Sequence, residues 1–75
     1  MTVNGGDKMQ IDRVKLIAEM ARQRVSVKDL VKRSGISEAT IVNVRAGKSC
    51  TMPTGILIAQ ALGMDLEDLE EVHNA

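Results

Sequence analysis

The stretch SVKDLVKRSGISEATIVNVRAG, residues 26–47, decides the fold. It contains two short segments with apolar residues at helical spacing, separated by only three residues. Ser26 and Ser37 precede the two segments and predict helix N-caps. Gly35 and Gly47 follow the segments and predict helix ends, because glycine tolerates a left-handed backbone. Two helices joined by so short a turn cannot lie antiparallel, so we expect them to cross at a steep angle.

Periodicity and capping residues predict an all-α chain of five helices. These helices are expected at about residues 10–23, 27–34, 38–46, 54–62 and 66–71. No strand pattern appears anywhere in the sequence. A variant capping box of Ser26 and Asp29 should begin the second helix, and Asp65 should cap the last one. The buried stripe of the first helix is expected to consist of Ile11, Val14, Ile17, Ala18, Ala21 and Val25, widened by Leu16 and Met20.

Length and composition limit the chain to one domain. Its 75 residues can hold a single hydrophobic core, and 44% hydrophobic with 27% charged residues is typical of a globular chain. We divide it into a flexible arm at 1–9, a helix-turn-helix domain at 10–72 and a frayed C-terminus at 73–75. The absence of aromatic residues argues against proteins that bind single strands by stacking bases on aromatic rings.

The formal net charge of zero conceals a division along the chain. Residues 1–48 carry all ten Lys and Arg and five of the ten acids, whereas residues 49–75 carry the other five acids and no Lys or Arg. The first part is therefore positive by five charges and the second negative by five. A positive part of this size favours a polyanion as partner, although segregation by chance in a short chain is the alternative.

The sequence gives no sign of catalysis or of a bound cofactor. One cysteine and one histidine cannot supply a four-ligand zinc site or an internal disulfide, and a lone thiol favours a reducing, cytoplasmic setting. His73 lies in the frayed end, where it cannot serve as a fixed base, and Cys50 is expected to be inert. We therefore expect no enzyme activity, metal, cofactor or small-molecule ligand, and no insertion into a membrane.

The quoted stretch resembles the helix-turn-helix of the lambda-repressor-like (Cro and repressor type, XRE) DNA-binding family. The resemblance extends over about residues 11–70 and rests on Leu30, Gly35, Ile36, Ser37, Ile41, Val44 and Gly47. It implies a compact five-helix lambda-repressor-like domain that binds double-stranded DNA. The departures from the family pattern are Val27 where Gln often opens the motif, Val31 where a small residue is usual, and Gly55 where Leu is usual.

The resemblance, together with groove dimensions, assigns the helix at 38–46 to the major groove. Base contacts are expected from its exposed first turns, namely Glu38, Ala39, Thr40, Val42 and Asn43. Asn43 could pair with adenine through two hydrogen bonds, and Glu38 could accept one from cytosine. Phosphate contacts are expected from Ser26, Lys28, Ser37, Arg45, Lys48 and Ser49. For each of these residues, a plain solvated helix or loop position is the alternative.

One helix-turn-helix unit reads only a few base pairs, so we expect a homodimer on DNA. Ile56 and Leu57 are apolar where a core helix usually shows polar groups, and with Val72 they are the candidates for the dimer contact. Packing against the first helix within one chain is the competing account.

The function expected is that of a small sequence-specific regulator of transcription, a repressor of the phage or mobile-element type. The alternative is a protein-interaction module of the antitoxin or anti-repressor type, on the same fold and with little DNA binding.

Overall fold

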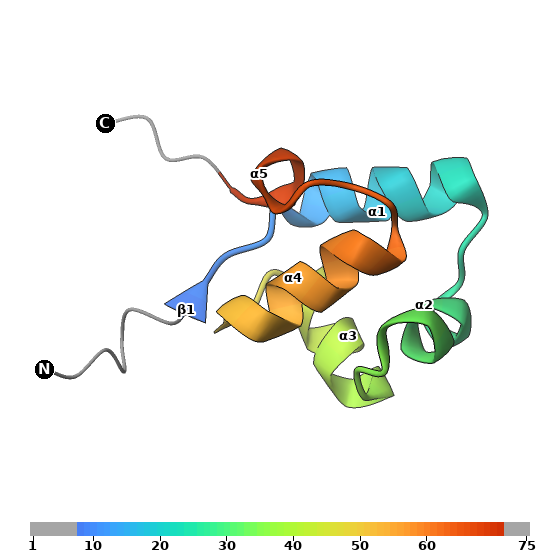
Figure 1. Ribbon diagram of the computed structural model, residues 1–75, viewed down its shortest axis with the longest axis horizontal. Coiled ribbons are helices and arrows are strands. Elements are labelled where there is room, and N and C mark those ends of the chain that lie inside the picture. Colours follow the sequence, from blue (N-terminus) through green and yellow to red (C-terminus); the bar gives the residue numbers. More distant parts are fainter. Residues whose placement is uncertain (1–7, 72–75) are drawn as a thin grey trace, which may run out of the picture.

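The computed structural model describes residues 8–71, which form five helices and a small sheet (Figure 1). The helices are α1 (Arg13–Gln23), α2 (Val27–Ser34), α3 (Glu38–Arg45), α4 (Met52–Ala61) and α5 (Leu66–Leu69). Helix α1 crosses the top of the molecule in Figure 1, α4 runs below it, and α2 and α3 lie at the lower right. The expected five-helix architecture is confirmed.

The expectation of no strands was wrong. Strand β1 (Lys8–Met9) pairs antiparallel with β2 (Cys50–Thr51). Met9 is only 6% exposed and lies in this strand with Lys8, so these two residues do not belong to the flexible arm predicted at 1–9; residues 1–7 lie outside the described part of the chain. Strands of two residues show no period-2 alternation, and their pairing joins segments about 40 residues apart, so no local pattern indicates them.

Five helix boundaries differ from the prediction, and two of them, the ends of α3 and α4, differ by a single residue. Helix α1 begins three residues later than expected, because the Asp12 carboxylate caps it by accepting hydrogen bonds from the backbone N–H groups of Val14 and Lys15, at 3.0 and 3.2 Å. Helix α4 begins two residues earlier than expected, with Thr51 as its N-cap. Helix α5 ends at Leu69, and Asp65 occupies its N-cap position without a side-chain capping hydrogen bond.

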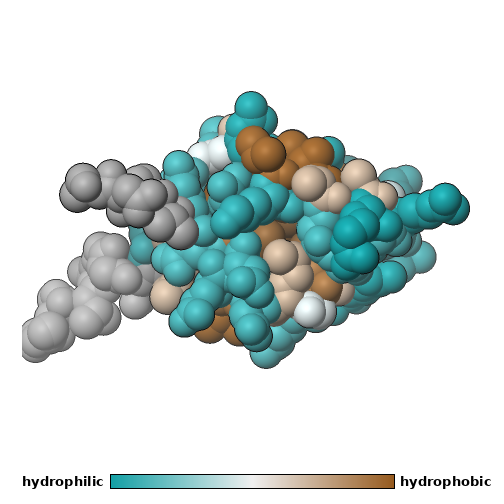
Figure 2. All heavy atoms as spheres, turned by 90° about the horizontal axis from the view of Figure 1, so that it is seen from above, coloured by the Kyte–Doolittle hydropathy of each residue, from teal (hydrophilic) through white to brown (hydrophobic). Residues whose placement is uncertain are grey.

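Half of the buried stripe predicted for the first helix was wrong. Leu16 and Met20 are the residues of α1 that are buried, whereas Val14 is 69% exposed and Ile17 36% exposed, and Ala18 and Ala21 are exposed as well. The other two members of the stripe, Ile11 and Val25, lie outside the helix and are buried. Figure 2, which looks onto the side of the molecule where α1 lies, shows hydrophobic surface among hydrophilic groups.

At Gly55, where the family usually has leucine, the space of the missing side chain is filled by another residue. The glycine is buried on α4, and a Cβ atom there would overlap Met9 Sδ and lie 3.3 Å from Met9 Cε. The thioether of Met9 thus occupies the volume that a side chain at residue 55 would fill. Through Met9, strand β1 therefore contributes to the hydrophobic core, which also contains Leu30, Ile41, Val44, Ile58 and Leu69.

Candidate nucleic-acid interface

The turn between α2 and α3 is built by local hydrogen bonds. Gly35 ends α2 in the left-handed conformation, with φ of 76°, as predicted. The buried hydroxyl of Ser34 donates to the Leu30 carbonyl at 2.6 Å and accepts from the Ile36 N–H at 3.1 Å. Ser37 then caps α3, its hydroxyl accepting from the Thr40 N–H. The sequence prediction overlooked Ser34, although a small hydroxyl residue directly before a turn glycine is a signal that could have been used.

Helix α3 has one buried side and one exposed side. Ile41 and Val44 are fully enclosed and fix the helix to the core. Four exposed side chains of α3 and that of its C-cap residue Ala46 lie, by their spacing, on one continuous face, which we call the α3 outer face: Glu38, Ala39, Val42, Asn43 and Ala46. Thr40 is half-buried at its edge and accepts a hydrogen bond from the Ser37 hydroxyl at 3.0 Å. The predicted base-contacting residues therefore lie together on one side of α3.

A helix-turn-helix with a free face on its second helix is the arrangement of DNA-binding domains. The family model of the Cro/C1-type HTH DNA-binding domain matches residues 15–74. The chain belongs to this Cro/C1-type family. Comparison with curated proteins and with solved structures gave no significant match. The family resemblance seen in the sequence is confirmed, and the protein carries a domain typical of DNA-binding regulators.

The N-terminus of α2 in this Cro/C1-type domain is already partly occupied. The Ser26 hydroxyl accepts from the Asp29 N–H at 3.0 Å, and the Asp29 carboxylate accepts from the Ser26 N–H at 3.1 Å. This is the predicted capping box. The Ser26 N–H and hydroxyl lower the pKa of Asp29 below its usual range, so the carboxylate is charged near neutral pH. Fewer free N–H groups and a nearby negative charge leave Lys28, exposed on the first turn, as the stronger attraction for a phosphate here.

The segment after α3 provides the other exposed cation among the predicted phosphate contacts. Lys48 and Ser49 are both exposed, directly after the left-handed Gly47. Arg45 is half-buried, and its Nε atom is enclosed without a hydrogen-bond partner. The Nε of Arg45 is thus withheld from a ligand.

Five of the acidic residues of the Cro/C1-type domain gather on and around α5. Helix α5 and its flanks contain Asp65, Glu67, Asp68, Glu70 and Glu71, and Figure 1 places α5 at the upper left, with α2 and α3 at the lower right. Within residues 8–71 the one ion pair is that of Arg22 with Glu19, on α1. The hydrogen bonds from Arg22 and then Gln23 lower the pKa of Glu19 to about 2. Glu38 is an acid on α3 itself, and Glu71 borders a groove with Ala46 and Gly47 at the end of α3, so acids are not excluded from the α3 side.

The structure also locates the residues considered for other roles. Cys50 is buried, and burial raises the pKa of its thiol, so the thiol is protonated and unreactive near neutral pH. His73 and Val72 lie outside the described residues. Within residues 8–71 no group of three or more His, Cys, Asp or Glu could hold a metal ion. No helix in the same range is long and apolar enough to cross a membrane.

Two of the predicted dimer residues remain uncovered on α4. Ile56 is 41% exposed and Leu57 is 40% exposed, and Met52 on the same helix is 36% exposed. Each therefore keeps apolar surface that a second copy could cover, and packing against α1 within the chain stays the competing account.

Proposed function

We propose that the protein is a sequence-specific double-stranded DNA-binding transcriptional regulator, a repressor of the phage or mobile-element type, which acts by binding and not by catalysis. The observation that carries the proposal is the α3 outer face, held rigidly by Ile41 and Val44 and free of covering elements among the described residues. A helix with its side chains, about 10–12 Å across, fits a major groove about 12 Å wide.

Base readings follow from the chemistry of the outer face. Asn43 can donate and accept in a two-bond pair with adenine, and Glu38 can accept from the cytosine amine. Ala39, Thr40 and Val42 offer methyl groups to the 5-methyl of thymine, and Val42 is 47% exposed. Phosphates would be bound by Lys28, Lys48 and Ser49, with weaker contributions from Ser26, Ser37 and Arg45, whose polar atoms are partly engaged or enclosed.

A homodimer would place two such helices one turn of DNA apart, about 34–36 Å. Support comes from the adjacent apolar residues Ile56 and Leu57 on α4, which a second copy could cover. A two-fold pair would double the number of base pairs read without any further domain.

The test is a selection of tight-binding duplexes from a random pool, followed by two variants measured on the selected duplex and on mixed-sequence DNA. Asn43→Ala should lose about 10-fold or more on the selected duplex and little on the mixed one, because a two-bond base contact contributes about 1–3 kcal/mol of discrimination. Lys48→Gln should weaken both duplexes alike, because phosphates carry no sequence. A pool that yields no preferred sequence would refute the sequence-specific part of the proposal.

The second candidate function is a protein-interaction module of the antitoxin or anti-repressor type. It is favoured by the exposed apolar side of α1, where Val14 and Ile17 follow at helical spacing and are 69% and 36% exposed. Wild-type protein that fails to bind any duplex at low salt would leave this candidate alone, since phosphate attraction is strongest there.

A further inference from the structure

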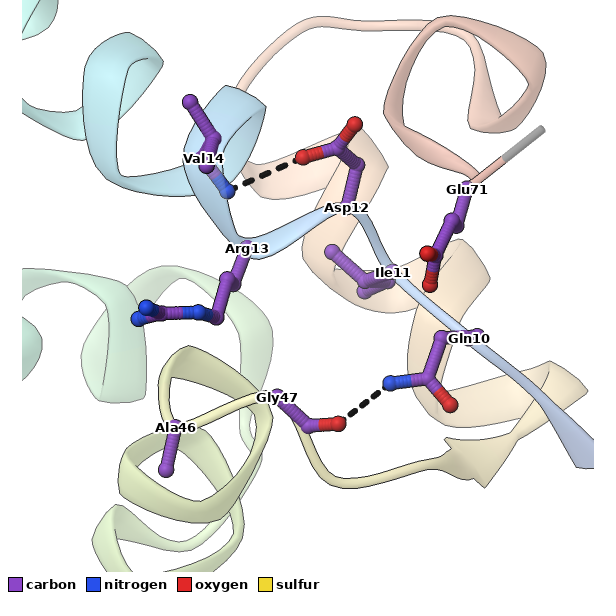
Figure 3. Close-up of a pocket in the computed structure, with 8 residues that line it drawn as sticks. All are labelled: Gln10, Ile11, Asp12, Arg13, Val14, Ala46, Gly47 and Glu71. Carbon is purple, nitrogen blue, oxygen red and sulfur yellow. Dashed lines mark hydrogen bonds between the residues drawn. The ribbon is translucent and has the colours of Figure 1, made fainter. Parts of the chain in front are cut away.

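The first turn of α1 places a cation, Arg13, at the end of α3. No pattern in the sequence had associated this residue with DNA. Figure 3 shows Arg13 reaching from the first turn of α1 over Ala46 and Gly47. An ideal Cβ on Gly47 would lie 3.3 Å from Arg13 Cδ, so the aliphatic part of the arginine rests against this glycine. Gly47 needs its left-handed backbone, with φ of 98°, and its missing side chain leaves the space that Arg13 occupies.

The position of Arg13 is fixed by the backbone around it. The Gln10 side-chain amide donates to the Gly47 carbonyl, tying the chain before α1 to the end of α3 (Figure 3). Asp12 caps α1 and also donates its backbone N–H to the Leu69 carbonyl at 2.9 Å. The arginine thus extends from a segment held at both α3 and α5, and a positioned cation binds an anion with less loss of side-chain entropy.

The guanidinium has no partner within residues 8–71. Arg13 is exposed and forms no ion pair or side-chain hydrogen bond there. Arg13 and Gly47 line an open groove of about 460 Å³, and two acids, Asp12 and Glu71, line it as well. The Asp12 carboxylate is engaged at the N-cap of α1, and Figure 3 shows the Arg13 guanidinium pointing away from Glu71. Lys48 is exposed directly after Gly47, so two cations flank this glycine.

We propose that Arg13 binds a DNA backbone phosphate beside Lys48 and thereby sets the depth of α3 in the groove. The inference rests on the proposed function. Because helix and groove have nearly equal widths, groups directly beside the end of α3 meet the phosphates of the groove rim and not the base edges. A guanidinium suits this place, because its planar N–H groups match phosphate oxygens in pairs.

A purely structural role is the competing explanation, since a cation near the last carbonyls of α3 also stabilises the helix. The two roles differ in salt dependence. A lost phosphate contact makes the negative slope of log K against log salt shallower by about 0.9, whereas a lost structural contact lowers thermal stability and leaves the slope unchanged.

The experiment measures binding of the full chain to a mixed-sequence 20-base-pair duplex between 50 and 200 mM salt. Arg13→Met keeps an aliphatic chain over Gly47 and removes the charge, and Arg13→Gln is a second neutral variant should the first fail to fold. Either should make the slope shallower by about 0.9, which corresponds to about 15-fold weaker binding at 50 mM and about fourfold at 200 mM. Lys48→Gln should act alike. Lys15→Gln is the matched control, because residue 15 lies about 200° around α1 from residue 13 and should leave the slope unchanged.

The outcomes separate the inference from the proposed function. A normal slope for the neutral Arg13 variants, with a reduced slope for Lys48→Gln, would overturn the role of Arg13 and leave DNA binding in place. Absence of wild-type binding at 50 mM would overturn the proposed function itself. A reduced slope for Arg13→Met that Arg13→Lys restores would support the phosphate contact.

Discussion

The contact between Met9 and Gly55 predicts a specific coupling between strand β1 and α4. Gly55→Ala places a Cβ on the Met9 thioether, and overpacking of this kind costs about 1–3 kcal/mol. Replacing glycine by alanine inside a helix returns up to about 1 kcal/mol. We therefore expect Gly55→Ala to lower the free energy of unfolding by about 1 kcal/mol, although alanine is the better helix former.

Met9→Ala and Gly55→Ala combined should lower the free energy of unfolding by less than the sum of their separate effects. Met9→Ala empties the volume beside α4 and should cost about 2 kcal/mol, the lower end for buried methionine because the residue lies in a strand at the edge of the fold. In that background the new methyl group at residue 55 has room, so Gly55→Ala should be neutral or stabilising. The expected coupling energy is about 1–2 kcal/mol in favour of the double variant.

Urea unfolding followed by circular dichroism at 222 nm measures all four proteins. Fluorescence is not an option, since the chain has no aromatic residues. A chain of this size has a stability of about 4–11 kcal/mol, so these differences are resolvable. Gly55→Ala combined with Val42→Ala, an exposed position on α3, is the additive control. Additivity of Met9→Ala and Gly55→Ala within about 0.5 kcal/mol would refute the packing of Met9 against Gly55.

Three further predictions concern single positions. Gly47→Ala should cost more unfolding free energy than Gly35→Ala, because both residues are left-handed but only a methyl group at residue 47 also displaces a side chain; equal urea midpoints would contradict this. The pKa of Glu19 in the folded protein, about 2, lies below the ordinary 4.5, so the stabilisation from this carboxylate is present above pH 4.5 and is lost as the pH falls toward 2. In Glu19→Gln the urea midpoint should therefore depend less on pH between 4.5 and 2, and an unchanged pH dependence would contradict the prediction. Ile56→Glu should lower the sedimentation-derived association constant at least 10-fold with little change in unfolding, whereas Ile17→Glu on α1 should leave association intact; the reverse order would move the dimer contact to α1.

The sequence predicts what is decided locally. Ser26, Ser37 and Gly35 act through atoms within four residues of themselves, so their patterns are sufficient to place α2, α3 and the turn. The exposed side of α3 follows from the same spacing, because Ile41 and Val44 leave the opposite face to solvent. The positions of the predicted base-contacting residues on one face could therefore be obtained without coordinates.

The sequence does not predict the structure where two faces of a helix are equally apolar or where the contacting residues are far apart along the chain. Helix α1 carries apolar residues on two sides, and spacing alone does not decide whether Leu16 and Met20 or Val14 and Ile17 face the core. That choice depends on the helices that α1 meets. Pairing of β1 with β2 is equally non-local. The buried Gly55 on an otherwise apolar helix was a usable signal, since a glycine there requires some other group to fill the space.

The segment before α1 connects the stability of the fold to its proposed recognition of DNA. Residues 9–12 contact α4, the end of α3 and α5 in turn: the first packs against α4, Gln10 donates to the Gly47 carbonyl, and the last donates to the Leu69 carbonyl. Arg13 follows directly and inherits its position from these three contacts. A substitution that loosens this segment, such as one at residue 9, should therefore weaken binding to all duplexes as well as stability. A substitution on the α3 outer face should change sequence preference while leaving the urea midpoint unchanged, because that face has no partner within the described part of the chain.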